Sequence, residues 1–129
     1  MSRGLNKVMV IGNLGRDPEL RYTPSGKPVV HFPVATSRSW VTSDGERREA
    51  TEWFNAVAWG NLAEICNQYL RKGSRVYLEG HLQTRTWEDA EGRPHSRVEL
   101  VVSEMIILDN RARENTSRSE PVEEDDLAY

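Results

Sequence analysis

Cysteine is almost absent from this 129-residue sequence, with Cys66 as the single copy. One cysteine cannot form an internal disulfide, which excludes a disulfide-stapled scaffold and favours a reducing compartment. The three histidines, His31, His81 and His95, lack the spacing of metal ligands. No window approaches the ~18 apolar residues of a membrane span, and the first residues lack the apolar centre of a secretory signal. We therefore expect a cytoplasmic protein without metal, cofactor or membrane segment.

An excess of positive charge is also missing, since the formal net charge is -3 and the isoelectric point is about 5.6. Taken alone, this argues against nucleic acid, because nucleic-acid-binding domains are usually basic. The charge is uneven, however. Residues 109–129 hold three arginines and seven acidic residues, so that segment carries -4 and residues 1–108 carry +1. A body so close to neutral can still gather its basic residues on one face.

Alternating apolar residues predict a chain built mainly of strands. The expected strand ranges are 5–14, 19–22, 29–37, 50–59, 75–87 and 95–108. Residues 24–28, PSGKP, and residues 89–92, DAEG, have the composition of hairpin turns. Gly12 in the first strand and Gly15 just after it suggest bends or bulges of the kind that a closed barrel requires.

One segment has helical rather than strand periodicity. Its apolar residues are spaced i, i+3, i+4, i+7 and i+8, which predicts a single apolar stripe on a helix; they are Leu62, Ile65, Cys66, Tyr69 and Leu70. Asn61 is the expected N-cap, with Glu64 three residues later. Gly73 is the residue expected to close the helix in a left-handed conformation.

This order of elements matches the OB-fold, a five-stranded Greek-key barrel that often binds oligonucleotides. Counting residues 19–22 as the start of the second strand gives the five strands, and the single helix precedes the last hairpin. The fold prediction is therefore an all-β OB-fold barrel with one helix over residues 1–108. From about Asp109 the apolar pattern stops, and residues 109–129 are expected to form a disordered acidic tail.

Four tryptophans are the most informative side chains: Trp40, Trp53, Trp59 and Trp87. Trp53 and Trp59 lie six positions apart on one strand, and this even spacing predicts that they share a face. Arginines surround the four, and this mixture suits single-stranded nucleic acid, because bases stack on aromatic rings while phosphates meet cations. The alternative is that these tryptophans are core or subunit-contact residues.

The sequence also resembles a known family, the bacterial single-stranded DNA-binding proteins. The resemblance covers about residues 2–108 and rests on the segments 2–8 (SRGLNKV), 12–22 (GNLGRDPELRY), 35–37 (ATS) with Trp40, 51–53 (TEW), 69–74 (YLRKGS), 76–80 (VYLEG) and 84–87 (TRTW). It implies an OB-fold, usually a homotetramer wrapped by DNA, in the cytoplasm at the nucleoid. The family's stacking aromatics fall on the four tryptophans. The basic residues through which the family contacts DNA map onto Arg3, Lys7, Arg21, Lys72 and Arg85.

The end of the chain is an acidic run with an apolar, aromatic terminus: Glu123, Glu124, Asp125, Asp126, Leu127 and Tyr129. A partner protein with an apolar pocket and a basic rim is the kind of receptor that fits such a tail. The family's tail commonly ends with Pro before its last residue, where this chain has Ala128. The simpler alternative is an acidic tail that only aids solubility. A third possible role is intramolecular, in which these acidic residues compete with DNA for the basic groove.

The sequence thus predicts a non-enzymatic protein that binds and protects single-stranded DNA in replication, recombination and repair, and recruits partner proteins through its tail. Two other classes stay open at this point. One is an OB-fold protein-interaction module whose tryptophans serve subunit contacts. The other is a small nuclease, against which the lack of a cluster of histidines and acids argues. A phosphate-binding loop is excluded, because residues 12–15 lack the required Gly-Lys-Ser/Thr ending.

Overall fold

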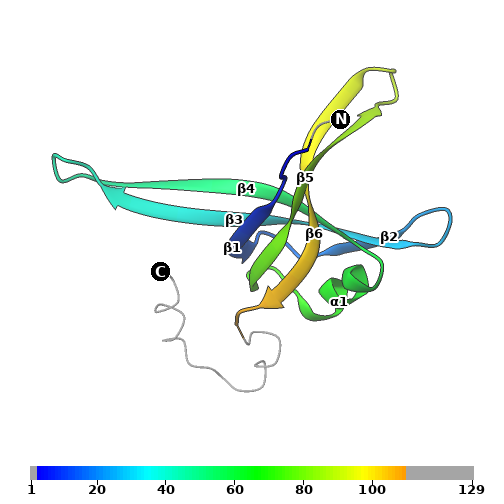
Figure 1. The fold of residues 1–129 in the computed structure, drawn as a ribbon, viewed down its shortest axis with the longest axis horizontal. Helices are drawn as coiled ribbons and strands as arrows, with labels where there is room; N and C mark the ends of the chain where they lie inside the picture. Colours follow the sequence, from blue (N-terminus) through cyan, green and yellow to red (C-terminus); the bar gives the residue numbers. More distant parts are fainter. Residues whose placement is uncertain (1–2, 110–129) are drawn as a thin grey trace.

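The computed structural model describes residues 3–109 of the chain (Figure 1). These residues form six strands and one helix, in the order β1 (Val8–Leu14), β2 (Glu19–Tyr22), β3 (Pro28–Val41), β4 (Arg47–Trp59), α1 (Asn61–Tyr69), β5 (Arg75–Glu88) and β6 (Pro94–Ile107). The tail residues named above, from Glu123 to Tyr129, lie outside the described residues. Among the described residues no helix has the length and apolar character needed to cross a membrane.

Five of the strands close into a barrel, which confirms the predicted OB-fold. The sheet order is β1-β5-β6-β4-β3, and a further pairing between β1 and β3 joins the two ends. All these pairs are antiparallel except β4 with β6, which is parallel. Residues 19–22 are not the start of the second barrel strand. They form a separate strand, β2, that pairs only with β3 as a hairpin outside the ring.

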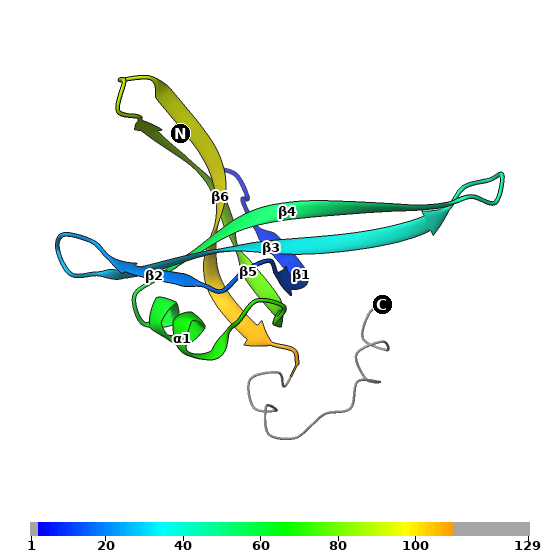
Figure 2. The same cartoon turned by 180° about the vertical axis from the view of Figure 1, so that it is seen from behind.

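Besides the β2–β3 hairpin, two hairpins made by longer strands extend well beyond the barrel, and they project in different directions in both views (Figures 1 and 2). The β3–β4 hairpin pairs continuously from Val29 with Trp59 out to Val41 with Arg47. Both strands are longer than predicted, because backbone hydrogen bonding continues past the last apolar residues into a polar stretch. We call these projections the β3–β4 arm and the β5–β6 arm.

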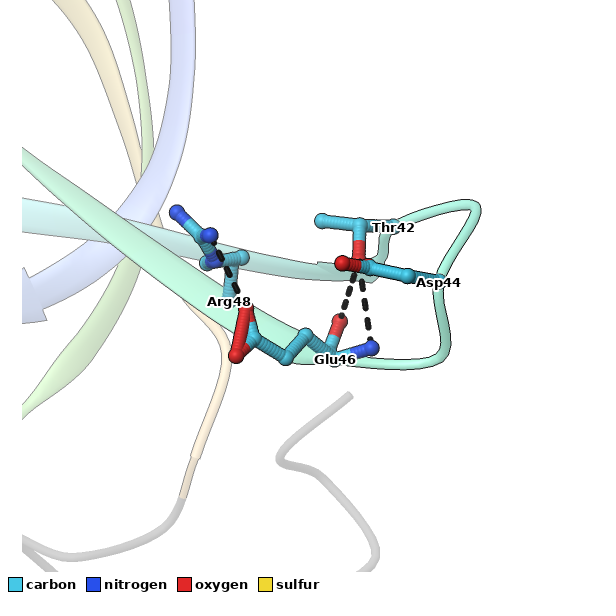
Figure 3. A network of polar contacts seen from close by, with 4 residues as sticks. All are labelled: Thr42, Asp44, Glu46 and Arg48. Carbon is cyan, nitrogen blue, oxygen red and sulfur yellow. Dashed lines mark hydrogen bonds and ion pairs between the residues drawn. The ribbon is translucent and has the colours of Figure 1, made fainter.

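A small polar network holds the tip of the β3–β4 arm (Figure 3). The Thr42 hydroxyl donates to the carboxylate of Asp44 and accepts a hydrogen bond of 3.1 Å from the backbone N–H of Glu46. The Glu46 carboxylate in turn lies 2.9 Å from the Arg48 guanidinium. The turn is therefore a defined structure that orders both strand ends, and one of its arginines is already paired with an acid.

The core lies inside the barrel and is filled from alternate positions of every barrel strand. Its fully buried side chains include Val30, Phe32, Val34, Val76, Leu78 and Leu100. Two glycines allow strands to approach closely: a Cβ at Gly12 would overlap the Ala35 carbonyl, and one at Gly80 would overlap the Val101 carbonyl. Among residues 3–109, the ladder register shifts at Glu79/Gly80 of β5, rather than in β1.

The helix packs at one end of the barrel through Ala63 and Cys66, and Leu70 just after the helix is also fully buried. Ile65 and Tyr69 of the predicted stripe are instead exposed, because a nine-residue helix presents only a narrow face to the barrel. The cap predictions were wrong by position. Gly60 is the N-cap (φ 67°), and Gly73 (φ 90°) lies in the turn after the helix has ended at Tyr69.

Candidate nucleic-acid interface

Trp53 and Trp59 lie on the same side of β4, as their even spacing predicted. Ala56 and Ala58, between them, face the core, so alternation turns both tryptophans outward. The edge of the Trp53 ring lies close to Gly15, and the residue is 60% exposed. On β3 the register partner of Trp59 is Val29, which pairs on its other side with Arg21 of β2. Arg21, a predicted phosphate contact, is thus in the same cross-strand row as Trp59, a predicted stacking residue.

The same outer side continues across β6 and β5. Val57 of β4 is aligned with Val101 of β6, Arg97 pairs with Arg85, and His95 pairs with Trp87. Alternation then places Glu99, Arg97, Arg85 and Trp87 on the side that carries Trp53 and Trp59. A contact of 3.7 Å between Glu99 of β6 and His31 of β3 joins the part of this surface on β3 and β4 to the part on β5 and β6. We call this surface the tryptophan side; its members are Trp53, Trp59, Trp87, His31, Glu99, Arg85 and Arg97.

Trp40 does not belong to this surface. It pairs with Arg48 near the end of the β3–β4 arm, at an even-numbered position of β3. The even-numbered residues Val30, Phe32 and Val34 face the core, so Trp40 lies on the side of the arm opposite to Trp53. The structure therefore brings three of the four tryptophans to one side of the sheet and leaves the fourth on the far side of an arm.

Cations lie over the rings of three tryptophans. The ammonium of Lys27 is 5.2 Å from the centre of the Trp59 ring, and the Arg38 guanidinium is 4.8 Å from that of Trp40. Arg85 and Arg97 lie 5.0 and 5.6 Å from the Trp87 ring centre. These distances fall within the range of cation–π attraction. Each of these three rings therefore has a positive charge within reach of a phosphate attached to a stacked base.

The predicted phosphate contacts are spread over different parts of the molecule. Arg85 is at the Trp87 ring, and Arg21 is beside the Trp59 row, where it pairs with Glu19 at 2.9 Å. Arg3 and Lys72 are exposed, and the Lys72 backbone N–H donates to the Asp17 carboxylate. Their assignment as DNA contacts stays a prediction.

Lys7 lies in a different environment, outside the tryptophan side. Its ammonium is 2.7 Å from the Glu79 carboxylate, which also accepts a 2.7 Å hydrogen bond from the Tyr77 hydroxyl. The hydrogen bonds from Lys7 and Tyr77 lower the pKa of Glu79, and the same pairing raises the pKa of Lys7. This lysine therefore already has an anionic partner on the outer surface of β1 and β5.

An acid at the centre of the tryptophan side was not predicted. The Glu99 side chain is only 8% exposed, and it lies 3.7 Å from His31 and 4.0 Å from Arg85. Burial lowers the pKa of His31, even though Glu99 opposes this effect. His31 is therefore neutral near pH 7, and Arg85 is the cation that faces the buried carboxylate.

Groups suited to metal or nucleophilic chemistry do not gather on this surface. Within residues 3–109 no group of three or more His, Cys, Asp or Glu side chains is arranged to hold a metal ion. Cys66 is buried on α1, where desolvation raises the pKa of its thiol to about 12. The thiolate, which is the reactive form of cysteine, is thus strongly disfavoured.

A closed OB barrel with tryptophans and arginines on its outer side defines a class of oligonucleotide-binding module. Residues 5–108 match the family described as the single-strand binding protein family. The chain belongs to this family.

Relatives and solved structures agree with this assignment. The chain is 54% identical over 109 residues to single-stranded DNA-binding protein 1 of Chlorobaculum tepidum, covering 84% of this chain and 67% of that protein. Its structure is similar to that of a Plasmodium falciparum single-strand binding protein in complex with single-stranded DNA. The TM-score is 0.74 at 33% identity, over 84% of this chain and 99% of that one. The structure is also similar to that of a deletion mutant of the single-stranded DNA-binding protein from Thermus aquaticus. The TM-score is 0.73 at 33% identity, over 88% of this chain and 55% of that one.

Proposed function

We propose that this protein binds and protects single-stranded DNA, without sequence preference, in replication, recombination and repair. The observation that carries the proposal is the tryptophan side, where three indole rings from β4 and β5 lie among Lys27, Arg85 and Arg97. Each base offers a flat ring and each phosphate a charge, so this surface suits any sequence. The proposed role is binding rather than catalysis, in the cytoplasm at the nucleoid.

The same arrangement favours single strands over duplex. Bases in a duplex are already stacked on each other, so their faces are not available to Trp53, Trp59 and Trp87. Phosphate neutralisation by lysine and arginine releases counterions, so the affinity is expected to fall as salt rises. Tryptophan fluorescence should be quenched by oligo-dT and not by duplex of equal length, and the binding constant should weaken with salt.

Replacing Trp53 by Ala tests the proposal directly. Loss of one stacking surface should weaken oligo-dT binding by about 5- to 150-fold, which corresponds to ~1–3 kcal/mol. The fold should survive, since Trp53 lies mostly in solvent. The matched control is Tyr69→Ala, because Tyr69 is also an exposed aromatic residue but lies on α1. Fluorescence anisotropy of labelled oligo-dT measures both variants, and equal affinities for the two would contradict the stacking assignment.

We also propose that the chain assembles as a homotetramer. Apolar residues gather on the outer surface of β1, β5 and β6, where Ile11 pairs with Tyr77 and Tyr77 with Ile106. Ile11 and Ile106 are each at least half exposed, and Met9 extends the patch along β1. Apolar residues clustered on a surface favour association. Ile11→Asp should give smaller species in sedimentation velocity. Val41→Asp, at an exposed position near the arm tip, should leave the assembly unchanged.

Recruitment of replication and repair proteins through the acidic tail remains part of the proposal. Its support is the sequence of residues 123–129, in which four consecutive acids precede Leu127 and Tyr129. A free peptide with this sequence should compete with the full chain for such a partner. If the free peptide does not reduce binding of the full chain to the partner, docking through the tail is contradicted.

A further inference from the structure

The tip of the β5–β6 arm holds a second ring against Trp87. His95 is the direct cross-strand partner of Trp87, and the two rings are stacked, with centroids 5.5 Å apart and planes inclined by 18°. Paired aromatic rings at this distance attract each other beyond the effect of burial. One face of the Trp87 indole is thus in contact with an imidazole contributed by β6.

His95 is itself anchored to the turn that joins the two strands. Its Nε2 lies 2.8 Å from Oδ2 of Asp89. The other carboxylate oxygen of Asp89 accepts hydrogen bonds of 2.9 Å from the backbone N–H groups of Glu91 and Arg93. The bond to His95 is the largest of the contacts that lower the pKa of Asp89. A continuous chain of contacts therefore runs from the turn backbone through Asp89 and His95 to the Trp87 ring.

This chain of contacts has a consequence for a ligand that stacks on Trp87. A tryptophan on an exposed hairpin would otherwise sample several rotamers, and binding would have to immobilise it. Contact with His95 restricts the ring before any ligand arrives, and a base that stacks on the indole displaces the guanidinium groups of Arg85 and Arg97, which lie over the ring at 5.0 and 5.6 Å. Arg85 and Arg97, on the same side of the arm, supply the charges for the phosphates next to that base.

We propose that His95, held by Asp89, is a positioning residue that orients the Trp87 ring for stacking with a nucleic-acid base. This inference rests on the proposed function and adds to it a residue that acts through Trp87 rather than on the DNA. His95 lies outside the sets of stacking and phosphate-contact residues predicted from the sequence. Only the cross-strand register brings it to Trp87.

The test is a double-mutant cycle, measured by anisotropy with labelled oligo-dT on the full chain. His95→Ala should weaken binding by about 2- to 10-fold, because the ring is no longer held. In the Trp87→Ala background, the same change should have no further effect, since there is no ring left to position. His95→Phe restores a stacking ring without the bond to Asp89 and should recover most of the affinity. Ser96→Ala, at the neighbouring exposed position, is the matched control.

Each outcome decides the proposal, and its failure can be told apart from that of the proposed function. If Trp87→Ala weakens binding and His95→Ala does not, the positioning role is wrong while single-stranded DNA binding stands. An equal loss from His95→Ala with and without Trp87 would also overturn it, because His95 would then act independently. If the parent chain fails to bind oligo-dT, both proposals are wrong. Thermal unfolding of every variant shows whether the arm is intact, and His95→Phe keeps the test decisive if His95→Ala is unstable.

Discussion

Gly15 controls the position of the Trp53 ring, so adding one methyl group there should weaken DNA binding. A Cβ at Gly15 would lie 2.6 and 2.9 Å from two atoms of the indole edge and 3.4 Å from Pro33. Carbon atoms prefer separations of about 3.5–4.0 Å, so the ring edge must retreat by roughly 1 Å in Gly15→Ala. Such a small rotation of an exposed side chain stays inside its rotamer well, and the stability loss should be below about 1 kcal/mol.

The effect on binding should exceed the effect on stability. A tilted ring loses part of its stacking contact, which we take as roughly half of the ~1–3 kcal/mol of one base–aromatic stack. Gly15→Ala should therefore weaken oligo-dT binding by about 2- to 12-fold in anisotropy titrations. Gly4→Ala is the control, because a Cβ at Gly4 meets no atom within 4 Å. Unchanged affinity in Gly15→Ala, with the fold intact, would show that the position of the Trp53 ring is immaterial.

Three further predictions concern stability and reactivity. Gly80→Ala should lower the unfolding free energy measured in urea by more than about 3 kcal/mol, because its Cβ would overlap the backbone of Val101 and neither strand can move aside. A loss below about 1 kcal/mol would refute the close approach of the two strands. Burial lowers the pKa of His31 in the folded chain, so the unfolded chain binds the proton more readily. Unfolding free energy should fall as the pH drops below about 6.5, and His31→Gln should show a shallower fall between pH 7.5 and 5.5; identical slopes would contradict this. Cys66, whose thiol pKa is raised to about 12, should react slowly with a thiol reagent at pH 8 in the native state and rapidly once unfolded; fast native labelling would place it at the surface.

The barrel could be predicted from the sequence because its signals are local. Alternation marked the strands, a change to helical spacing marked α1, and even spacing put Trp53 and Trp59 on one face. The opposite orientation of Trp40 was also present in the pattern, since it has the same parity as the buried residues Phe32 and Val34. The apolar alternation that predicts this strand ends at residue 37, so the pattern did not include Trp40 in the strand.

Other parts of the site depend on contacts between segments that are distant in the chain. Lys27 was treated as part of a turn, and only the register of β3 against β4, which pairs Val29 with Trp59, brings it over that ring. Glu99 reaches His31 only through the parallel pairing of β4 with β6. The register of one strand against another is set by the packed barrel as a whole, and single-strand periodicity does not contain it.

The pairing of β1 has a consequence for synthesis of the protein on the ribosome. Met9 of β1 pairs with Glu79 of β5, seventy positions later, while the ladder that joins β1 to β3 has two residue pairs. At about 5–20 residues per second, roughly 4–14 s separate the emergence of these two strands. During that interval Val10 and Leu14, which are buried in the finished barrel, have little to cover them. Slow codons between β1 and β5 would lengthen this exposure, and the yield of correctly folded chains would fall as aggregation competes with barrel closure.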